Sequence, residues 1–238
     1  MLGLPDAITA CLFDLDGVLT KTAEVHARAW KQTFDAFLKA HGAEPFDLVH
    51  DYDEYVDGKP RLDGVRDFLA SRGIELPEGS PDDAGDAQTV QGVANAKNEI
   101  VLRLIHDEGV EAYDGSVRYL QAACDAGLRR AVVSSSHNCR DVLVAAGIEG
   151  LLEVRVDGLV AEERHLAGKP APDTFLEAAR ILGVDREHAA VFEDALAGVQ
   201  AGGAGGFGHV VGVDRAGQRE ALLSHGASVV VDDLAELL

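Results

Sequence analysis

The chain has 238 residues, 47% of them hydrophobic, and a formal net charge of −20 from 21 basic and 41 acidic residues. This length suits one large domain or two small ones with a sizeable core. The negative charge argues against a nucleic-acid partner, which requires a basic surface. No apolar run approaches the roughly 20 residues that span a membrane, and the N-terminal segment lacks the pattern of a secretory signal. Three scattered cysteines are typical of reduced thiols. We therefore expect a cytoplasmic protein without a membrane partner.

The first predicted element is a buried strand over residues 8–13. In residues 22–42 apolar side chains recur at helical spacing and end at Gly42, which predicts a helix that stops there. Two further helices are predicted on the same grounds, at 61–74 and 95–109. The segment between them, 76–92, is rich in Gly, Pro and Asp and is predicted to be a loop.

The pattern changes near residue 113, where helices begin to alternate with short apolar strands. These predicted strands are 130–135, 153–158, 189–194, 209–214 and 227–233. Strands separated by helices predict an α/β fold, a Rossmann-like parallel sheet with helices on both faces. The strand at 8–13 has no such neighbour until after residue 110, so we expect a helical insert. The predicted core is 1–20 and 109–238, and the predicted helical cap is 21–108.

Polar residues follow three of these strands. Asp14 and Asp16 follow the first strand, Ser134 lies at the end of the second, and Glu193 with Asp194 lies at the end of another. In open α/β sheets ligands bind beyond the carboxyl ends of the strands, so these side chains are expected to converge. Paired acids repel each other unless a cation joins them, and a cluster of carboxylate oxygens suits Mg²⁺ better than zinc. The alternative is that the acids only cap a helix and occupy a solvated turn.

Four motifs in the same order resemble those of the haloacid dehalogenase superfamily of phosphoryl-transfer enzymes. The segment "DLDGVLT" matches the first motif, hhhDxDGxhx. Ser134 after "AVV", Lys169 in "GKPAPD" and the pair Glu193 and Asp194 in "FEDA" match the other three. One motif alone is a weak signal, but four ordered motifs at suitable spacing are a strong one.

The resemblance implies a role for each motif residue. Asp14 is expected to be the nucleophile that forms an aspartyl phosphate, and Asp16 the general acid and base. Ser134 and Lys169 are expected to bind the non-bridging phosphoryl oxygens.

The same resemblance implies the set of metal ligands. The expected Mg²⁺ ligands are Asp14, the backbone carbonyl of Asp16, Glu193 and Asp194.

The segment "TAEVHARAW" makes the insert similar to the cap of the β-phosphoglucomutase-like subfamily. That similarity implies substrate-side roles for Thr22, His26 and Trp30. His26 would help Asp16 switch between cap-open and cap-closed states, and Trp30 would pack in the cap. It assigns Arg61 to the distal phosphate of the substrate and makes Lys97 a cap lysine facing the substrate.

The segment "SSSHN" resembles the subfamily's phosphate-binding turn and gives Ser136 and Asn138. His137 stands where the subfamily has a lysine, which leaves part of the second phosphate site open.

The expected activity is therefore Mg²⁺-dependent isomerisation of a sugar phosphate, β-glucose 1-phosphate to glucose 6-phosphate through a 1,6-bisphosphate. The alternatives are a phosphatase for a small phosphorylated metabolite and, in another class, a non-catalytic binding protein. Phosphonate hydrolysis is less expected, because Lys97 is the one loosely plausible Schiff-base lysine. Nothing in the sequence demands a partner chain, so a monomer is expected.

Overall fold

The computed structural model describes residues 2–238, and its chain divides into two compact units. One unit comprises the chain up to Lys21 together with Val110–Leu238, and the other comprises Thr22–Gly109. We propose that these units are the core and the inserted cap. Within residues 2–238, no helix is both long enough and apolar enough to cross a membrane.

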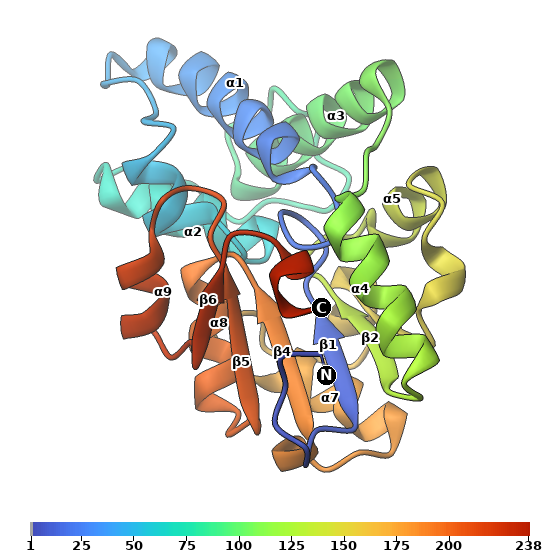
Figure 1. Cartoon of the computed structure of the whole chain (residues 1–238). Helices are drawn as coiled ribbons and strands as arrows, with labels where there is room; N and C mark the ends of the chain where they lie inside the picture. Colours follow the sequence, from blue (N-terminus) through green and yellow to red (C-terminus); the bar gives the residue numbers. More distant parts are fainter. Residues whose placement is uncertain (1) are drawn as a thin grey trace. The chain divides into compact units, whose positions relative to one another are not determined.

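A parallel sheet forms the centre of the first unit (Figure 1). Six strands within residues 2–238 pair in the order β3-β2-β1-β4-β5-β6. Their bounds are β1 Ala10–Phe13, β2 Arg129–Val133, β3 Val154–Val156, β4 Ala189–Glu193, β5 His209–Val213 and β6 Val229–Val231. The predicted Rossmann-like α/β fold is confirmed.

Helices cover both faces of this sheet, because alternate strand residues point to opposite sides. Leu12 of β1 shares a buried cluster with Phe175, Val199 and Leu222, which belong to three helices of one face. Phe13, the next residue of β1, packs edge-on against the Tyr119 ring of a helix on the other face, with centroids 6.2 Å apart. The helices of this unit are α4 Asp114–Asp125, α5 Cys139–Ala145, α6 Gly158–Glu163, α7 Asp173–Leu182, α8 Leu196–Ala204 and α9 Arg219–Ser224.

The register of the central strands brings their carboxyl ends level. Phe13, the last residue of β1, pairs with Val132 of β2 and with Phe192 of β4. The backbone N–H of Asp14 then donates to the Phe192 carbonyl at 2.9 Å. Because β1 is buried along its whole length between two partners, the residues that follow it emerge at one edge of the sheet beside Glu193.

The second unit is built from α1 Ala23–His41, α2 Arg61–Ser71 and α3 Val90–Glu108, with a short π-helix at Tyr52–Val56. Phe34 lies in its core, stacked on Trp30 at 5.0 Å and beside Phe68 at 4.1 Å between ring centroids. The helix predicted at 22–42 is α1, and it ends at Gly42, whose left-handed backbone (φ 65°) closes the last turn.

The sequence-based prediction was wrong about the start of α3, which begins at Val90 and not at residue 95. The Thr89 side chain accepts a hydrogen bond from the Gly92 N–H at 2.9 Å, so it caps the helix inside the segment predicted as a loop. The polar composition of residues 76–92 concealed this cap.

The cysteines differ enough in environment to predict a labelling pattern. Burial raises the pKa of the Cys11 thiol to about 12 and raises that of Cys139 well above its usual range, whereas Cys124 is exposed. Since the thiolate is the reactive form, iodoacetamide at about pH 8 should modify Cys124 alone in the folded protein. Peptide mass spectrometry checks this, with guanidinium-unfolded protein, in which all three react, as the control. Labelling of Cys11 as fast as Cys124 in the native protein would contradict the burial described here.

Candidate active site

A buried ion cluster lies where β1 and β4 end. Lys169, which is 2% exposed, donates a short hydrogen bond to Asp14 Oδ1, and its Nζ lies 2.5 Å from Glu193 Oε1. The same ammonium donates to the Val133 carbonyl at 3.1 Å. One cation thus contacts two carboxylates and the end of β2, and a residue from the segment before α7 joins the ends of three strands.

The charges in this cluster control each other's protonation. Burial raises the pKa of Asp14, Lys169 lowers it, and the neighbouring carboxylates of Glu193 and Asp16 raise it further, so that it lies well above its usual range. Burial alone lowers the pKa of Lys169, but Asp14 and Glu193 outweigh that effect and raise it overall. Lys169 therefore stays a cation, and it faces more than one carboxyl group.

Ligand atoms of Asp14, Glu193 and Asp194 lie within 4.8 Å of one another, and all three residues are buried. The backbone approaches these acids so closely that a Cβ on Gly17 would lie 1.7 Å from Asp194 Oδ2, and one on Gly198 would lie 1.8 Å from Glu193 Oε1. Two glycines therefore leave room for the carboxylates to face one another. An oxygen-only donor set with one lysine and a surplus of negative charge fits a hard divalent cation such as Mg²⁺.

The loop that carries Asp16 is closed by its own backbone. The Gly17 N–H donates to the Thr20 carbonyl at 2.8 Å, and the N–H groups of Leu19 and Thr20 both donate to the Leu15 carbonyl at 2.9 Å. Gly17 holds a φ of 84°, which a residue with a side chain rarely adopts. This sharp turn places Asp14 and Asp16 in one tight loop directly after β1.

A turn rich in hydroxyls follows β2. The Ser136 N–H donates to Ser134 Oγ, and the Asn138 N–H donates to Ser136 Oγ, each at 3.1 Å. These contacts use oxygen lone pairs and leave both hydroxyl protons to donate to an anion. His137, in the same turn, lies 3.9 Å from Glu162 Oε2.

The remaining predicted residues belong to the second unit. Lys97 Nζ lies 2.8 Å from His26 Nδ1 and 4.8 Å from the centre of the Trp30 ring. A charged ammonium can only donate, and the geometry fits His26 Nδ1 as its acceptor. Thr22 is buried and precedes α1, and Arg61 begins α2. The structure therefore brings together His26, Trp30 and Lys97, and their roles towards a substrate stay predictions.

Two strand-end loops were missed by the sequence analysis. Asp157 follows β3, but it accepts from the Val160 N–H at 3.0 Å and lies 2.6 Å from Arg155 Nε, so it caps α6. In the loop after β5, Arg215 and Gln218 donate to backbone carbonyls of the two acid-bearing loops. Arg215 and Gln218 follow a strand that ends at the same edge of the sheet, and this position was the signal by which the sequence could have indicated them.

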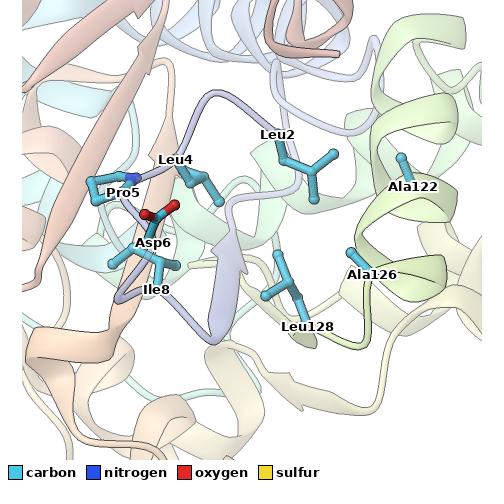
Figure 2. A pocket seen from close by; sticks show the side chains of 8 residues that line it. All are labelled: Leu2, Leu4, Pro5, Asp6, Ile8, Ala122, Ala126 and Leu128. Carbon is cyan, nitrogen blue, oxygen red and sulfur yellow. The ribbon is translucent and has the colours of Figure 1, made fainter.

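A pocket of about 360 Å³ lies in a different part of the first unit (Figure 2). It is lined by Leu2, Leu4, Pro5, Asp6, Ile8, Ala122, Ala126 and Leu128. Ile8 and Leu128 precede β1 and β2, so the pocket lies at the amino ends of the strands, opposite Asp14. Its lining is largely aliphatic and offers no cation for a phosphate.

Three comparisons place this geometry among known proteins. A family model described as haloacid dehalogenase-like hydrolase matches residues 8–206. A protein of Mycobacterium bovis named β-phosphoglucomutase is 57% identical over all of this chain and 94% of its own length. Hexitol phosphatase A of Escherichia coli is 30% identical over 85% of this chain and 82% of its own. The crystal structure of β-phosphoglucomutase from Clostridium difficile superposes with a TM-score of 0.78 at 25% identity, covering 97% of this chain and 93% of that one.

The acid cluster predicts that Mg²⁺ stabilises the folded protein. Saturating Mg²⁺ should raise the melting temperature of the wild type, since a ligand that binds only the folded state shifts unfolding by mass action. In Asp194→Asn this shift should be largely lost. Because the raised pKa of Asp14 lets a proton compete with the metal, the shift should also shrink as the pH falls.

Differential scanning calorimetry with EDTA-treated protein measures both effects, and Asp157→Asn is the matched control, since Asp157 is a buried strand-end acid outside the cluster. An Mg²⁺-induced shift of equal size in wild type and Asp194→Asn would show that the metal binds elsewhere.

Proposed function

Because the chain belongs to the haloacid dehalogenase-like hydrolase family, we propose that it is a Mg²⁺-dependent β-phosphoglucomutase, which interconverts β-glucose 1-phosphate and glucose 6-phosphate through a 1,6-bisphosphate. The observation that carries the proposal is the 57% identity to the M. bovis β-phosphoglucomutase over the whole chain. The buried cluster of Asp14, Lys169, Glu193 and Asp194 supports it from the chemical side.

Asp14 is the proposed nucleophile. Its carboxylate attacks phosphorus and takes up the phosphoryl group as an aspartyl phosphate, and the leaving oxygen departs on the opposite side. Asp14, the Asp16 carbonyl, Glu193 and Asp194 would hold Mg²⁺, which when bound supplies positive charge to the phosphoryl oxygens. Lys169 keeps its charge in the buried site and would bind a non-bridging oxygen.

Asp16 is the proposed general acid and base. In the first half-reaction it gives a proton to the leaving oxygen, and in the second it takes one from the attacking hydroxyl. The tight turn at Gly17 directs Asp16 to the same region as Asp14. The Ser134 hydroxyl would donate to a further phosphoryl oxygen.

A mutase must also hold the phosphate at the far end of the sugar while the bisphosphate turns around. We assign this second phosphate to Arg61, whose guanidinium can bind it bidentately, and to Ser136 and Asn138 in the turn after β2. His137 replaces the lysine of the subfamily in that turn and brings its charge only when protonated.

We assign Thr22, Trp30 and Lys97, which are buried, and His26, which is half-buried, to the substrate-facing side of the second unit. The contact between Lys97 Nζ and His26 Nδ1 orients the imidazole ring and supports this proposal. His26 would then present its other ring nitrogen, Nε2, to the substrate.

A phosphatase for a small phosphorylated metabolite is the second candidate, and the similarity to hexitol phosphatase A favours it. A phosphatase needs the nucleophile and the acid–base residue but no second phosphate site. The non-catalytic alternative requires the protein to keep the ion cluster around Lys169 although it catalyses no reaction. A sugar phosphate as the partner, a cytoplasmic location and a monomeric state stay proposals.

One assay separates these candidates. The protein is incubated with Mg²⁺, β-glucose 1-phosphate and a trace of the 1,6-bisphosphate, while glucose 6-phosphate and inorganic phosphate are followed separately. We expect glucose 6-phosphate to form without release of phosphate. Asp14→Asn is the matched variant, because it keeps the shape of the side chain and removes the nucleophile, and its turnover should be abolished.

Phosphate release from many substrates would instead support the phosphatase, and silence on a broad panel would support the binding protein. Turnover retained by Asp14→Asn would rule out Asp14 as the nucleophile.

A further inference from the structure

The loop after β5, Asp214–Gln218, bonds to both loops that carry the acids of the cluster. Arg215 Nε donates to the Gly17 carbonyl at 2.9 Å, and Gly17 directly follows Asp16. Gln218 Nε2 donates to the carbonyl of Asp194 at 3.2 Å. One loop therefore fixes a peptide group in each of two loops that are far apart in the sequence.

These two side chains are themselves held in place. Asp214 Oδ1 accepts from the Gln218 N–H at 2.8 Å, which closes the loop. The Arg215 guanidinium lies 3.7 Å from the centre of the Tyr113 ring, and its Nη1 donates to the Asp232 carbonyl at 2.7 Å. The Tyr113 ring and the Asp232 carbonyl thus hold the Arg215 guanidinium in place while its Nε donates to Gly17, so the Arg215 side chain has little conformational freedom.

The two contacted loops also press against each other. A Cβ on Gly17 would overlap the carboxylate of Asp194, so the positions of these two loops are mutually dependent. A small rotation of the peptide after Asp16 would move the Asp16 carbonyl and press on Asp194. The hydrogen bonds from the loop after β5 hold the Gly17 carbonyl, one peptide beyond the Asp16 carbonyl, and the Asp194 carbonyl itself, so they restrain the backbone beside each of these ligands.

We propose that Arg215 and Gln218 are positioning residues that preorganise the Mg²⁺ ligands of the Asp16 and Asp194 loops. The inference rests on the proposed function only in requiring Mg²⁺ at the acid cluster. Neither residue touches the reacting phosphoryl group, and neither belongs to the four motifs of the resemblance. Outer partners of metal ligands typically contribute a factor of about 10 to 100 in metal affinity.

The competing account is that Arg215 only ties the C-terminal segment to the sheet, because it also lies 3.5 Å from Asp233 Oδ2. Arg219 provides the matched control for that account. Its guanidinium donates to the Val230 carbonyl and pairs with Asp232, in the same C-terminal segment, each at 2.5 Å.

The test measures the Kd for Mg²⁺ by isothermal titration calorimetry on EDTA-treated full-length protein without substrate. Arg215→Met and Gln218→Met keep approximate side-chain length and remove the donors, and each should weaken Mg²⁺ binding about tenfold. Arg215→Lys should fall between, since a lysine keeps the charge but cannot fork to two carbonyls. Arg219→Met should bind Mg²⁺ as the wild type does.

In steady-state assays the Arg215 and Gln218 variants should require more Mg²⁺ for half-maximal rate, with the KM for sugar phosphate unchanged. Wild-type Kd in both methionine variants, with thermal stability lowered as in Arg219→Met, would overturn the proposal. If Arg215→Met fails to fold, Gln218→Met decides alone. A wild type that binds Mg²⁺ but does not isomerise sugar phosphate would refute the proposed function, and the comparison of Mg²⁺ affinities between the variants would still test the positioning role. A wild type that binds no Mg²⁺ would refute both the proposed function and the positioning role.

Discussion

A buried lysine held between two buried carboxylates is the constraint on which the site depends. Lys169, Asp14 and Glu193 are all withdrawn from water, and their desolvation costs several kcal/mol per ion unless each charge is matched. Lys169 matches part of the negative charge of the cluster, and a divalent cation is the natural match for the remainder. The same imbalance that makes the cluster costly by itself therefore makes it suited to bind a metal and a phosphoryl group.

The fold delivers this arrangement through the register of β1 with its two neighbours. Asp14 follows a fully buried strand, and Glu193 ends the adjacent strand in the same row. Lys169 comes from outside the sheet and reaches the Val133 carbonyl at the end of β2. By contrast, Asp157 at the end of β3 caps the next helix and meets an arginine, so position after a strand does not by itself create a site.

The sequence was sufficient to predict the sheet and the convergence of its strand-end acids, because alternating strands and helices restrict the fold and motif spacing identifies the residues. It was not sufficient to predict the contact between His26 and Lys97, which depends on how α1 and α3 pack. Nor did it reveal Arg215 and Gln218, since a backbone carbonyl as hydrogen-bond partner leaves no mark in the residue types of the contacted loop. The cap at Thr89 was hidden for a related reason, because one threonine in a polar stretch resembles loop composition.

The most direct test of this account is the free energy of unfolding of Lys169→Met, compared with the wild type in EDTA. Removing one partner of a buried ion cluster leaves unpaired charge, so near neutral pH the variant should be less stable by about 3–5 kcal/mol. Its deficit should shrink towards about pH 5, because protonation of Asp14, whose pKa burial raises well above its usual range, then relieves the unpaired charge. A loss below about 1 kcal/mol, as for an exposed ion pair, that does not change with pH would contradict the account.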